Sequence, residues 1–231
     1  MTMAVGIACV NANTNNEEEF KRMLCEMMRE IVRQYPDVGY GGGFYDRLMS
    51  DDAGPYGSFG NGSAMRVSPT VYAARSLEDA TRLARWSAEV THDHPEGIRG
   101  AEAVTAAIFL AAEGSSRDEI REYISRKYYD LDFTLDDIRP AYSFDVSCEG
   151  SVPQSIECFL EARNFEDALR NAISLGGDGD TIAAIAGAIA EAYFGIPDDI
   201  AEKAFEFMDE TEQEYYDEYA DELYRMKPKK A

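Results

Sequence analysis

One segment constrains the fold of this chain more than any other. It runs from Ser174 to Pro197 (SLGGDGDTIAAIAGAIAEAYFGIP), and its positions 182–190 are all apolar or glycine. A helix of that composition has no polar face, so it needs apolar partners around it. We therefore expect this helix, including its amino terminus, to be buried on every side within a larger helical domain. The apolar run is well short of the roughly 20 residues that span a bilayer.

Most of the remaining chain also has apolar residues at helical spacing. Asn16 and Glu19 are spaced as in a capping box, and Pro95 and Gly114 are placed as proline near a helix start and glycine past a helix end. Alternating strand patterns are scarce, so the sequence predicts one all-α domain. Helices are expected over residues 16–36, 76–92, 95–114, 117–129, 154–162, 165–174 and 198–208.

The net charge limits the kinds of partner. Lys and Arg total 22 against 44 Asp and Glu, which gives a formal charge of -22. Such a chain repels phosphate backbones and anionic membranes, so neither nucleic acid nor a membrane is an expected partner. The first residues lack a signal pattern and the cysteines form no Cys-x-x-Cys pair, so we expect a cytoplasmic protein with reduced thiols.

Two aspartates stand at the start of the apolar helix. A helix start stabilises a carboxylate, and capping explains one of them. Asp178 and Asp180 can both point at one spot together with the Thr181 hydroxyl, and hard oxygen ligands of this kind suit Mg²⁺ or Mn²⁺. Two like charges this close need a cation or protons. The residues leave two interpretations: a metal site, or a capped helix start with one solvated aspartate.

A glycine-rich stretch over residues 39–62 has too few apolar residues for a strand, and we expect an irregular loop with a function. Gly57, Gly60 and Gly62 let the backbone approach a ligand closely, and Asn61 adds a short polar group. Such a loop can present amides to a phosphate. It matches neither a Walker loop nor a Rossmann fingerprint. A tight structural turn is the alternative.

Both histidines of the chain, His92 and His94, lie in the segment from Thr91 to Gly97. With no third histidine or cysteine nearby, a zinc site is not indicated, and no nucleophile elbow is present for a serine hydrolase. We rank His92 above His94 for function because it closes the helix that follows the glycine-rich stretch. The alternative is a helix-cap or surface histidine.

Two further segments carry no recognisable chemistry. Residues 130–153 form a mixed connection with weak helical character over 135–138, interpreted as a surface excursion. Residues 209–222 hold eight acidic residues and no basic one, interleaved with tyrosines, and a short basic tail follows. A solvated helix with a frayed tail is the expected structure there.

Taken together, the three motifs resemble the ADP-ribosylglycohydrolase family. The family pattern Gly-Asn-Gly-(Ser/Gly)-Ala-Met-Arg appears at residues 60–66, Thr-His at 91–92 and Gly-Gly-Asp-Thr-Asp-Thr at 176–181, with Gly179 where threonine is commoner. The resemblance implies a compact orthogonal helical bundle over residues 1–208, followed by an acidic helix and basic tail over 209–231. It also implies a site for two Mg²⁺ ions. The implied reaction is hydrolysis of the glycosidic bond between ADP-ribose and a protein side chain or small molecule.

The resemblance also assigns roles to individual residues. Asp178, Asp180 and Thr181 would be metal ligands. An ADP-ribose pocket would be lined by Gly57, Ser58, Phe59, Gly60, Asn61, Gly62 and His92.

One part of the family pattern has no counterpart in this chain. Family members begin with a segment that supplies a catalytic Glu and then a Thr-Asp-Asp-Thr motif, and this sequence starts on the helix that follows them. Ser50, Asp51 and Asp52 mimic that motif, but they come after that helix, inside the glycine-rich stretch. Half of the metal ligands and the catalytic Glu are therefore expected to be missing. This leaves a hydrolase whose natural chain extends further, a non-catalytic module that binds ADP-ribose or a related nucleotide, or a marginally stable fragment.

Overall fold

A computed structural model describes residues 1–50 and 54–226, and these residues form fourteen α-helices. Within them the only β pairing is an isolated antiparallel bridge between Gly60 and Ser147, which confirms the all-α prediction. Asp51, Asp52 and the basic tail lie outside the described residues. The helices are α1 (Thr2–Asn11), α2 (Glu17–Gln34), α3 (Gly42–Met49), α4 (Gly62–Met65), α5 (Pro69–Ala73), α6 (Leu77–Glu89), α7 (Pro95–Ala112), α8 (Arg117–Lys127), α9 (Leu135–Ile138), α10 (Cys148–Leu160), α11 (Phe165–Leu175), α12 (Gly179–Phe194), α13 (Asp198–Glu206) and α14 (Glu210–Met226).

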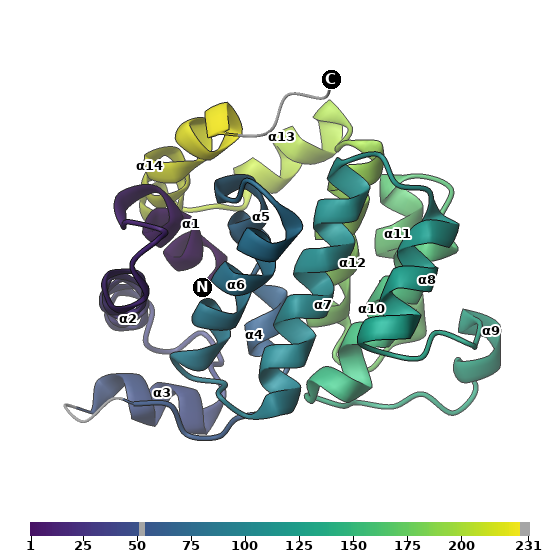
Figure 1. Cartoon of the computed structure of the whole chain (residues 1–231), viewed down its shortest axis with the longest axis horizontal. Coiled ribbons are helices and arrows are strands. Elements are labelled where there is room, and N and C mark those ends of the chain that lie inside the picture. Colours follow the sequence, from purple (N-terminus) through teal and green to yellow (C-terminus); the bar gives the residue numbers. More distant parts are fainter. Residues whose placement is uncertain (51–53, 227–231) are drawn as a thin grey trace.

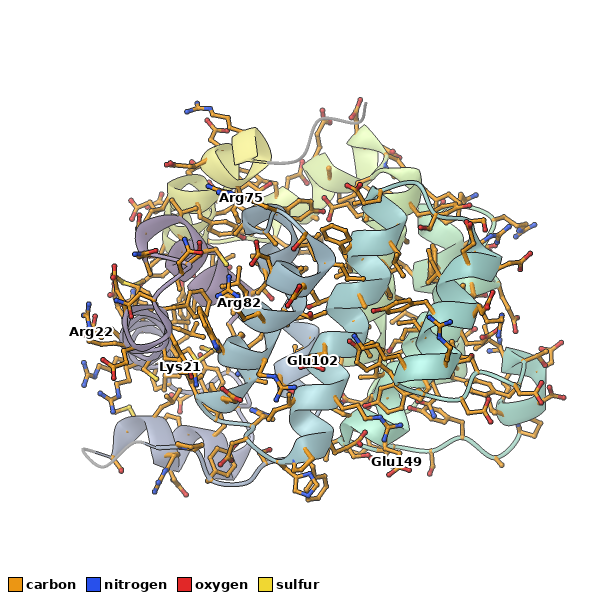
Figure 2. All side chains as sticks on the ribbon, viewed as in Figure 1. Lys21, Arg22, Arg75, Arg82, Glu102 and Glu149 are labelled. Carbon is orange, nitrogen blue, oxygen red and sulfur yellow. The ribbon has the colours of Figure 1, made fainter. Side chains whose placement is uncertain are left out.

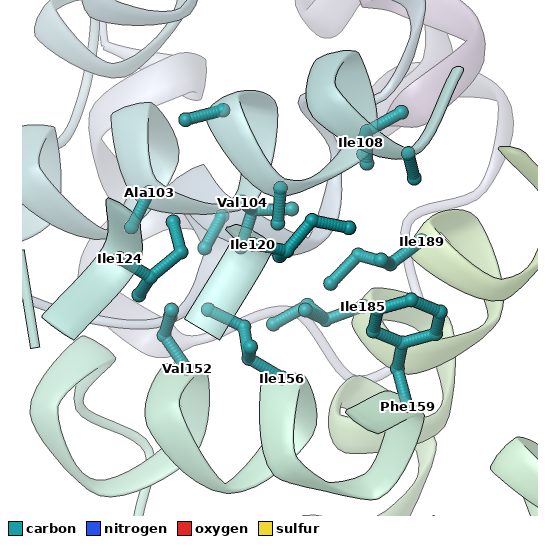
Figure 3. Packing of buried hydrophobic residues seen from close by; sticks show 14 of the residues in the cluster. Ala103, Val104, Ile108, Ile120, Ile124, Val152, Ile156, Phe159, Ile185 and Ile189 are labelled. Carbon is teal, nitrogen blue, oxygen red and sulfur yellow. The ribbon is translucent and has the colours of Figure 1, made fainter. Parts of the chain in front are cut away.

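Helices α7 and α12 pack together at the middle of the molecule (Figure 1). On one side α6 packs against α7 and contacts α2, while α5 contacts α1 and α14. On the other side lie α8, α10 and α11. Aliphatic side chains from α7, α8, α10 and α12 meet in the largest buried cluster, shown in Figure 3, which includes Val104, Ile120, Ile156 and Ile185. A second cluster is built on α1, α2 and α6. Burial of this aliphatic surface is the main force that holds the helices together.

The apolar helix α12 is less enclosed than expected. Ile182, Ile185 and Ile189 are buried, whereas Ala184 is exposed and Ala183 is half-buried. The prediction of burial on every side is therefore wrong on one flank, where only alanine methyl groups face outward and exposure costs little. Its amino terminus is also open to one side, because Asp180 is exposed while Thr181 is buried.

Most expected helices are present with small shifts at their ends. Asn16 caps α2 by accepting a hydrogen bond from the Glu19 amide, and Gly114 closes α7 with a positive φ. Lys21, on the side of α2 that faces α6 in Figure 2, pairs with Glu89 at 2.6 Å. The predicted start of α10 at residue 154 is six residues too late, because the helix begins at Cys148 and contains Pro153.

The glycine-rich stretch is not wholly irregular. Residues 42–49 form α3, whose Phe44 and Leu48 are one turn apart and buried in the second cluster. The prediction of a loop without helix is wrong there because these two apolar side chains suffice to anchor one face of a short helix. Residues 54–61, just before α4, are irregular apart from the β bridge at Gly60.

Helix α14 confirms the expected acidic helix, but it is not simply solvated. The ring of Tyr219 packs against Gly6 of α1, so closely that a Cβ at position 6 would lie 2.5 Å from it. Ala220 and Leu223 are also buried. No helix in the described part of the chain is long and apolar enough to cross a membrane.

Candidate functional site

The loop over residues 57–62 is held in place by a distant part of the chain. The Asn61 amide donates to the carbonyl of Val146 at 2.8 Å, and the Cys148 amide donates to the carbonyl of Phe59 at 3.0 Å. These two bonds form the Gly60–Ser147 bridge. The segment that leads into α10 therefore lines the site, and the interpretation of residues 130–153 as a surface excursion is wrong. That pairing joins residues far apart in sequence, so local pattern could not predict it.

The buried side chain of His92 packs against the glycines of this loop. Its Nε2 lies 3.2 Å from where a Cβ of Gly62 would stand and 3.5 Å from the same position at Gly60. The imidazole is 5% exposed, and its Nδ1 is 2.7 Å from the Thr91 hydroxyl. Burial, helped by the positive charge of Arg66, lowers the pKa of His92 to about 3. The ring is therefore neutral at physiological pH.

The side chain of Asn61 joins the loop to the start of α12. Its Nδ2 donates to Oδ2 of Asp178 at 2.7 Å and to the Ser151 hydroxyl at 2.9 Å. Asn61 itself is 7% exposed, so these bonds are shielded from water. The structure thus brings the three sequence motifs to one place. Within the loop, Gly62 lies against His92, and Asn61 is hydrogen-bonded to Asp178.

The two aspartates stand side by side at the open end of α12. Burial raises the pKa of Asp178, the neighbouring Asp180 carboxylate raises it further, and the bond from Asn61 offsets part of that rise. Burial is the larger cause of the raised pKa, and the crowding of like charges that the sequence indicated adds to it. Thr181 lies next in line, buried, with its hydroxyl donating to the Met65 sulfur at 3.7 Å.

These three side chains offer the oxygen ligands that Mg²⁺ prefers, and the repulsion between the carboxylates is relieved by a bound cation. Among the described residues, however, no group of three His, Cys, Asp or Glu side chains gathers at one point. The donor set therefore fits part of a metal site.

Gly177 fixes the turn that delivers Asp178. Its φ is +69°, and a Cβ there would lie 2.5 Å from the ring of Tyr142. Tyr142 in turn donates from its hydroxyl to the Gly150 carbonyl at 2.7 Å. Only glycine satisfies both the backbone conformation and this close approach.

The remaining predicted pocket residues lie along the same loop. Phe59 is 54% exposed, and the Ser58 hydroxyl accepts a hydrogen bond from the Gly60 amide at 3.2 Å. Sequence reasoning missed Asp93, whose carboxylate accepts from the Gly57 amide at 2.6 Å, although its place beside His92 was a usable signal. It also missed Ser151, which lies 90 residues from Asn61 and carried no signal.

An all-helical domain with a glycine-rich loop set against an aspartate-bearing helix start has the architecture that the family resemblance implies. The family model described as ADP-ribosylglycohydrolase matches residues 1–231. The chain therefore belongs to the ADP-ribosylglycohydrolase family.

Individual relatives agree with this assignment. ADP-ribosylhydrolase ARH3 of Homo sapiens is 30% identical over 234 residues, covering 74% of this chain and 64% of that protein. ADP-ribosylarginine hydrolase Tri1 of Pseudomonas putida (strain GB-1) is 27% identical over 144 residues, covering 59% of this chain and 39% of that protein. A solved structure titled ADP-ribosylglycohydrolase-related protein complex has a TM-score of 0.69 at 22% identity, covering 97% of this chain and 79% of that one, and it supports the fold. The chain spans less than two thirds of the length of the human relative.

Proposed function

We propose that this chain binds ADP-ribose and takes part in hydrolysis of the glycosidic bond that links ADP-ribose to a protein side chain or a small molecule, with Mg²⁺ or Mn²⁺ at Asp178, Asp180 and Thr181. The observation that carries the proposal is the bond from Asn61 to Asp178, which couples the glycine-rich loop to the carboxylates. Family membership supports the same reaction class.

The loop supplies the groups that hold the nucleotide. Backbone amides of a glycine-rich loop can donate to phosphate oxygens, and here Gly60 and Gly62 lie directly over the buried His92. The glycines leave no side chain between that backbone and the ligand, and the exposed Phe59 ring offers a face for stacking.

The carboxylates act at the sugar end. A divalent cation bound by Asp178, Asp180 and Thr181 supplies charge stabilisation and a template for the ribose hydroxyls. Asn61 holds Asp178 through one carboxylate oxygen, Oδ2. Fixing a carboxylate in this way reduces the rearrangement needed on binding.

The direct test uses the full chain with ADP-ribose and with an ADP-ribosylated peptide. Calorimetry is expected to show ADP-ribose binding, and release of ADP-ribose from the peptide is expected only with Mg²⁺ or Mn²⁺. Undiminished release in EDTA, or after Asp180→Ala, would contradict the metal assignment. Absence of binding heat with and without Mg²⁺ would contradict the ADP-ribose site.

One observation favours a second function, binding without cleavage. Glycoside hydrolysis uses two carboxyl groups in separate roles at the scissile bond. Here Asp178 and Asp180 are both assigned to the proposed metal, and within the described residues no third acidic side chain joins them in a cluster. A chain that binds ADP-ribose but leaves the peptide intact over prolonged incubation with Mg²⁺ would be such a binding module.

A further inference from the structure

A buried cation, Arg66, lies one short helix beyond the glycine-rich loop, and no described residue is its counterion. Arg66 follows α4 and is 1% exposed, and none of the ion pairs among the described residues includes it. One guanidinium nitrogen, Nη2, donates to the Ser87 carbonyl at 2.6 Å and to the Thr91 hydroxyl at 3.0 Å. Its Nε has no hydrogen-bond partner in the part of the chain that the structure describes. Burying a charge without an opposite charge carries a large desolvation penalty, which packing of the side chain alone does not explain.

The hydrogen-bond directions are constrained by chemistry. A guanidinium only donates, so the Thr91 oxygen accepts from Arg66. The hydroxyl proton of Thr91 then needs an acceptor, and Nδ1 of His92 lies 2.7 Å away. If Nδ1 carried the proton instead, the buried Thr91 hydroxyl would accept twice and its own proton would be unpaired, which is unfavourable. This places the imidazole proton on Nε2.

Nε2 is the ring nitrogen that faces the loop. It lies against Gly60 and Gly62 and has no hydrogen-bond acceptor among the described residues. Nε2 is not one of the fully buried polar atoms that lack a partner, so water or a ligand can reach its proton. The nearby positive charge of Arg66 also disfavours a second ring proton, so the ring is a neutral donor.

We propose that Arg66 and Thr91 are positioning residues that fix His92 in the tautomer with its proton on Nε2, aimed at an anionic oxygen of a diphosphate held by the loop. The ligand part of this inference rests on the proposed function, whereas the tautomer is a property of the free protein. The uncompensated charge of Arg66 adds a favourable potential for the same anion in a chain of net charge -22.

The first experiment reads the ring nitrogens of the full chain by NMR after ¹⁵N-histidine labelling. The chain has two histidines, and His94→Asn identifies the signals of His94 while keeping a side chain that can cap α7. We expect the remaining ring, His92, to be neutral with Nε2 protonated. A proton on Nδ1, or a doubly protonated ring at neutral pH, would overturn the proposal.

Matched variants then distinguish the chain of hydrogen bonds from Arg66 through Thr91 to His92, here called the relay, from a simple packing role of these residues. Thr91→Ser keeps the hydroxyl and is expected to preserve the tautomer. Thr91→Val keeps the shape and removes the donor, so we expect a mixed or reversed tautomer and about a tenfold loss of ADP-ribose affinity. An unchanged tautomer in Thr91→Val would refute the relay. If that variant fails to fold, Arg66→Lys, which also can only donate, should keep the ring proton on Nε2, and a reversed tautomer there would refute the relay. An Nε2-protonated His92 in a chain that does not bind ADP-ribose would leave the relay standing and refute the proposed function.

Discussion

Asn61 and Asp178 are 117 residues apart in the chain, yet Nδ2 of the first donates to Oδ2 of the second at 2.7 Å. The bond connects the groups proposed to hold the nucleotide with those proposed to hold the metal. Binding at one part of the site is therefore expected to influence the other.

Asn61→Ala tests this connection. The change leaves the Asp178 carboxylate and the Ser151 hydroxyl without their shared donor, and it is expected to lower the free energy of unfolding by about 1–3 kcal/mol. ADP-ribose affinity should fall, and the Mg²⁺ dependence of that affinity should weaken. Urea unfolding and calorimetry measure both effects. Asn15→Ala, at an exposed position, serves as the control and should leave both unchanged.

Asp180→Asn tests the pair of carboxylates. It removes one of the two charges that crowd the start of α12, so the variant is expected to be more thermostable than the wild type in metal-free buffer. The rise in melting temperature on adding Mg²⁺ should disappear, because a ligand to the ion has been lost. Glu202→Gln, on exposed α13, removes the same charge elsewhere and should change neither property. An undiminished Mg²⁺ response in Asp180→Asn would contradict the assignment.

The buried His92 predicts how stability depends on pH. Its pKa falls from 6.5 to about 3 in the folded state, so between these values the unfolded chain binds a proton that the folded chain does not. Stability should therefore decrease as pH falls through this range, by about 1.4 kcal/mol per pH unit from this group, and the penalty vanishes above pH 6.5. The measurement compares wild type with His92→Gln between about pH 5 and 6.5, and the variant should show the shallower slope. Equal slopes would mean that His92 is not buried in the neutral form.

Gly97→Ala tests the packing of α7 under the loop. A Cβ at this position would lie 2.7 Å from the Ser58 carbonyl oxygen and 2.9 Å from that of His92. Because both obstacles are backbone atoms, we expect a loss of about 1–3 kcal/mol in the free energy of unfolding, with weaker ADP-ribose binding. Gly43→Ala is the matched control. Its Cβ would make only an ordinary contact at 3.4 Å with Tyr56, and alanine favours the helix it lies in.

The sequence predicted the helices well because capping and apolar spacing are local signals. Asn16, Ser76 and Pro95 mark helix starts that the structure confirms. It could not predict that α3 forms, since two anchoring residues are too few to reveal a period, or that Ala184 faces outward, since composition does not say which flank lacks a neighbour.

The candidate site divides in the same way. The three motifs were recognisable because each is short and continuous in sequence. The bond from Asn61 to Ser151 and the pairing of the loop with Val146 were not, because they depend on tertiary contacts across the whole domain. Arg66 belonged to a recognised motif, yet only the structure shows that it is buried beside Thr91.

The pairing of Gly60 with Ser147 has a consequence for the order of folding. Bringing segments so distant in sequence together costs conformational entropy, because a long loop must be closed. We therefore expect these contacts to form later than helices and local turns. The ligand-binding surface is then completed only when the two halves of the chain have docked. A ligand that spans them would chiefly retard unfolding, and would have little influence on the earliest steps of collapse.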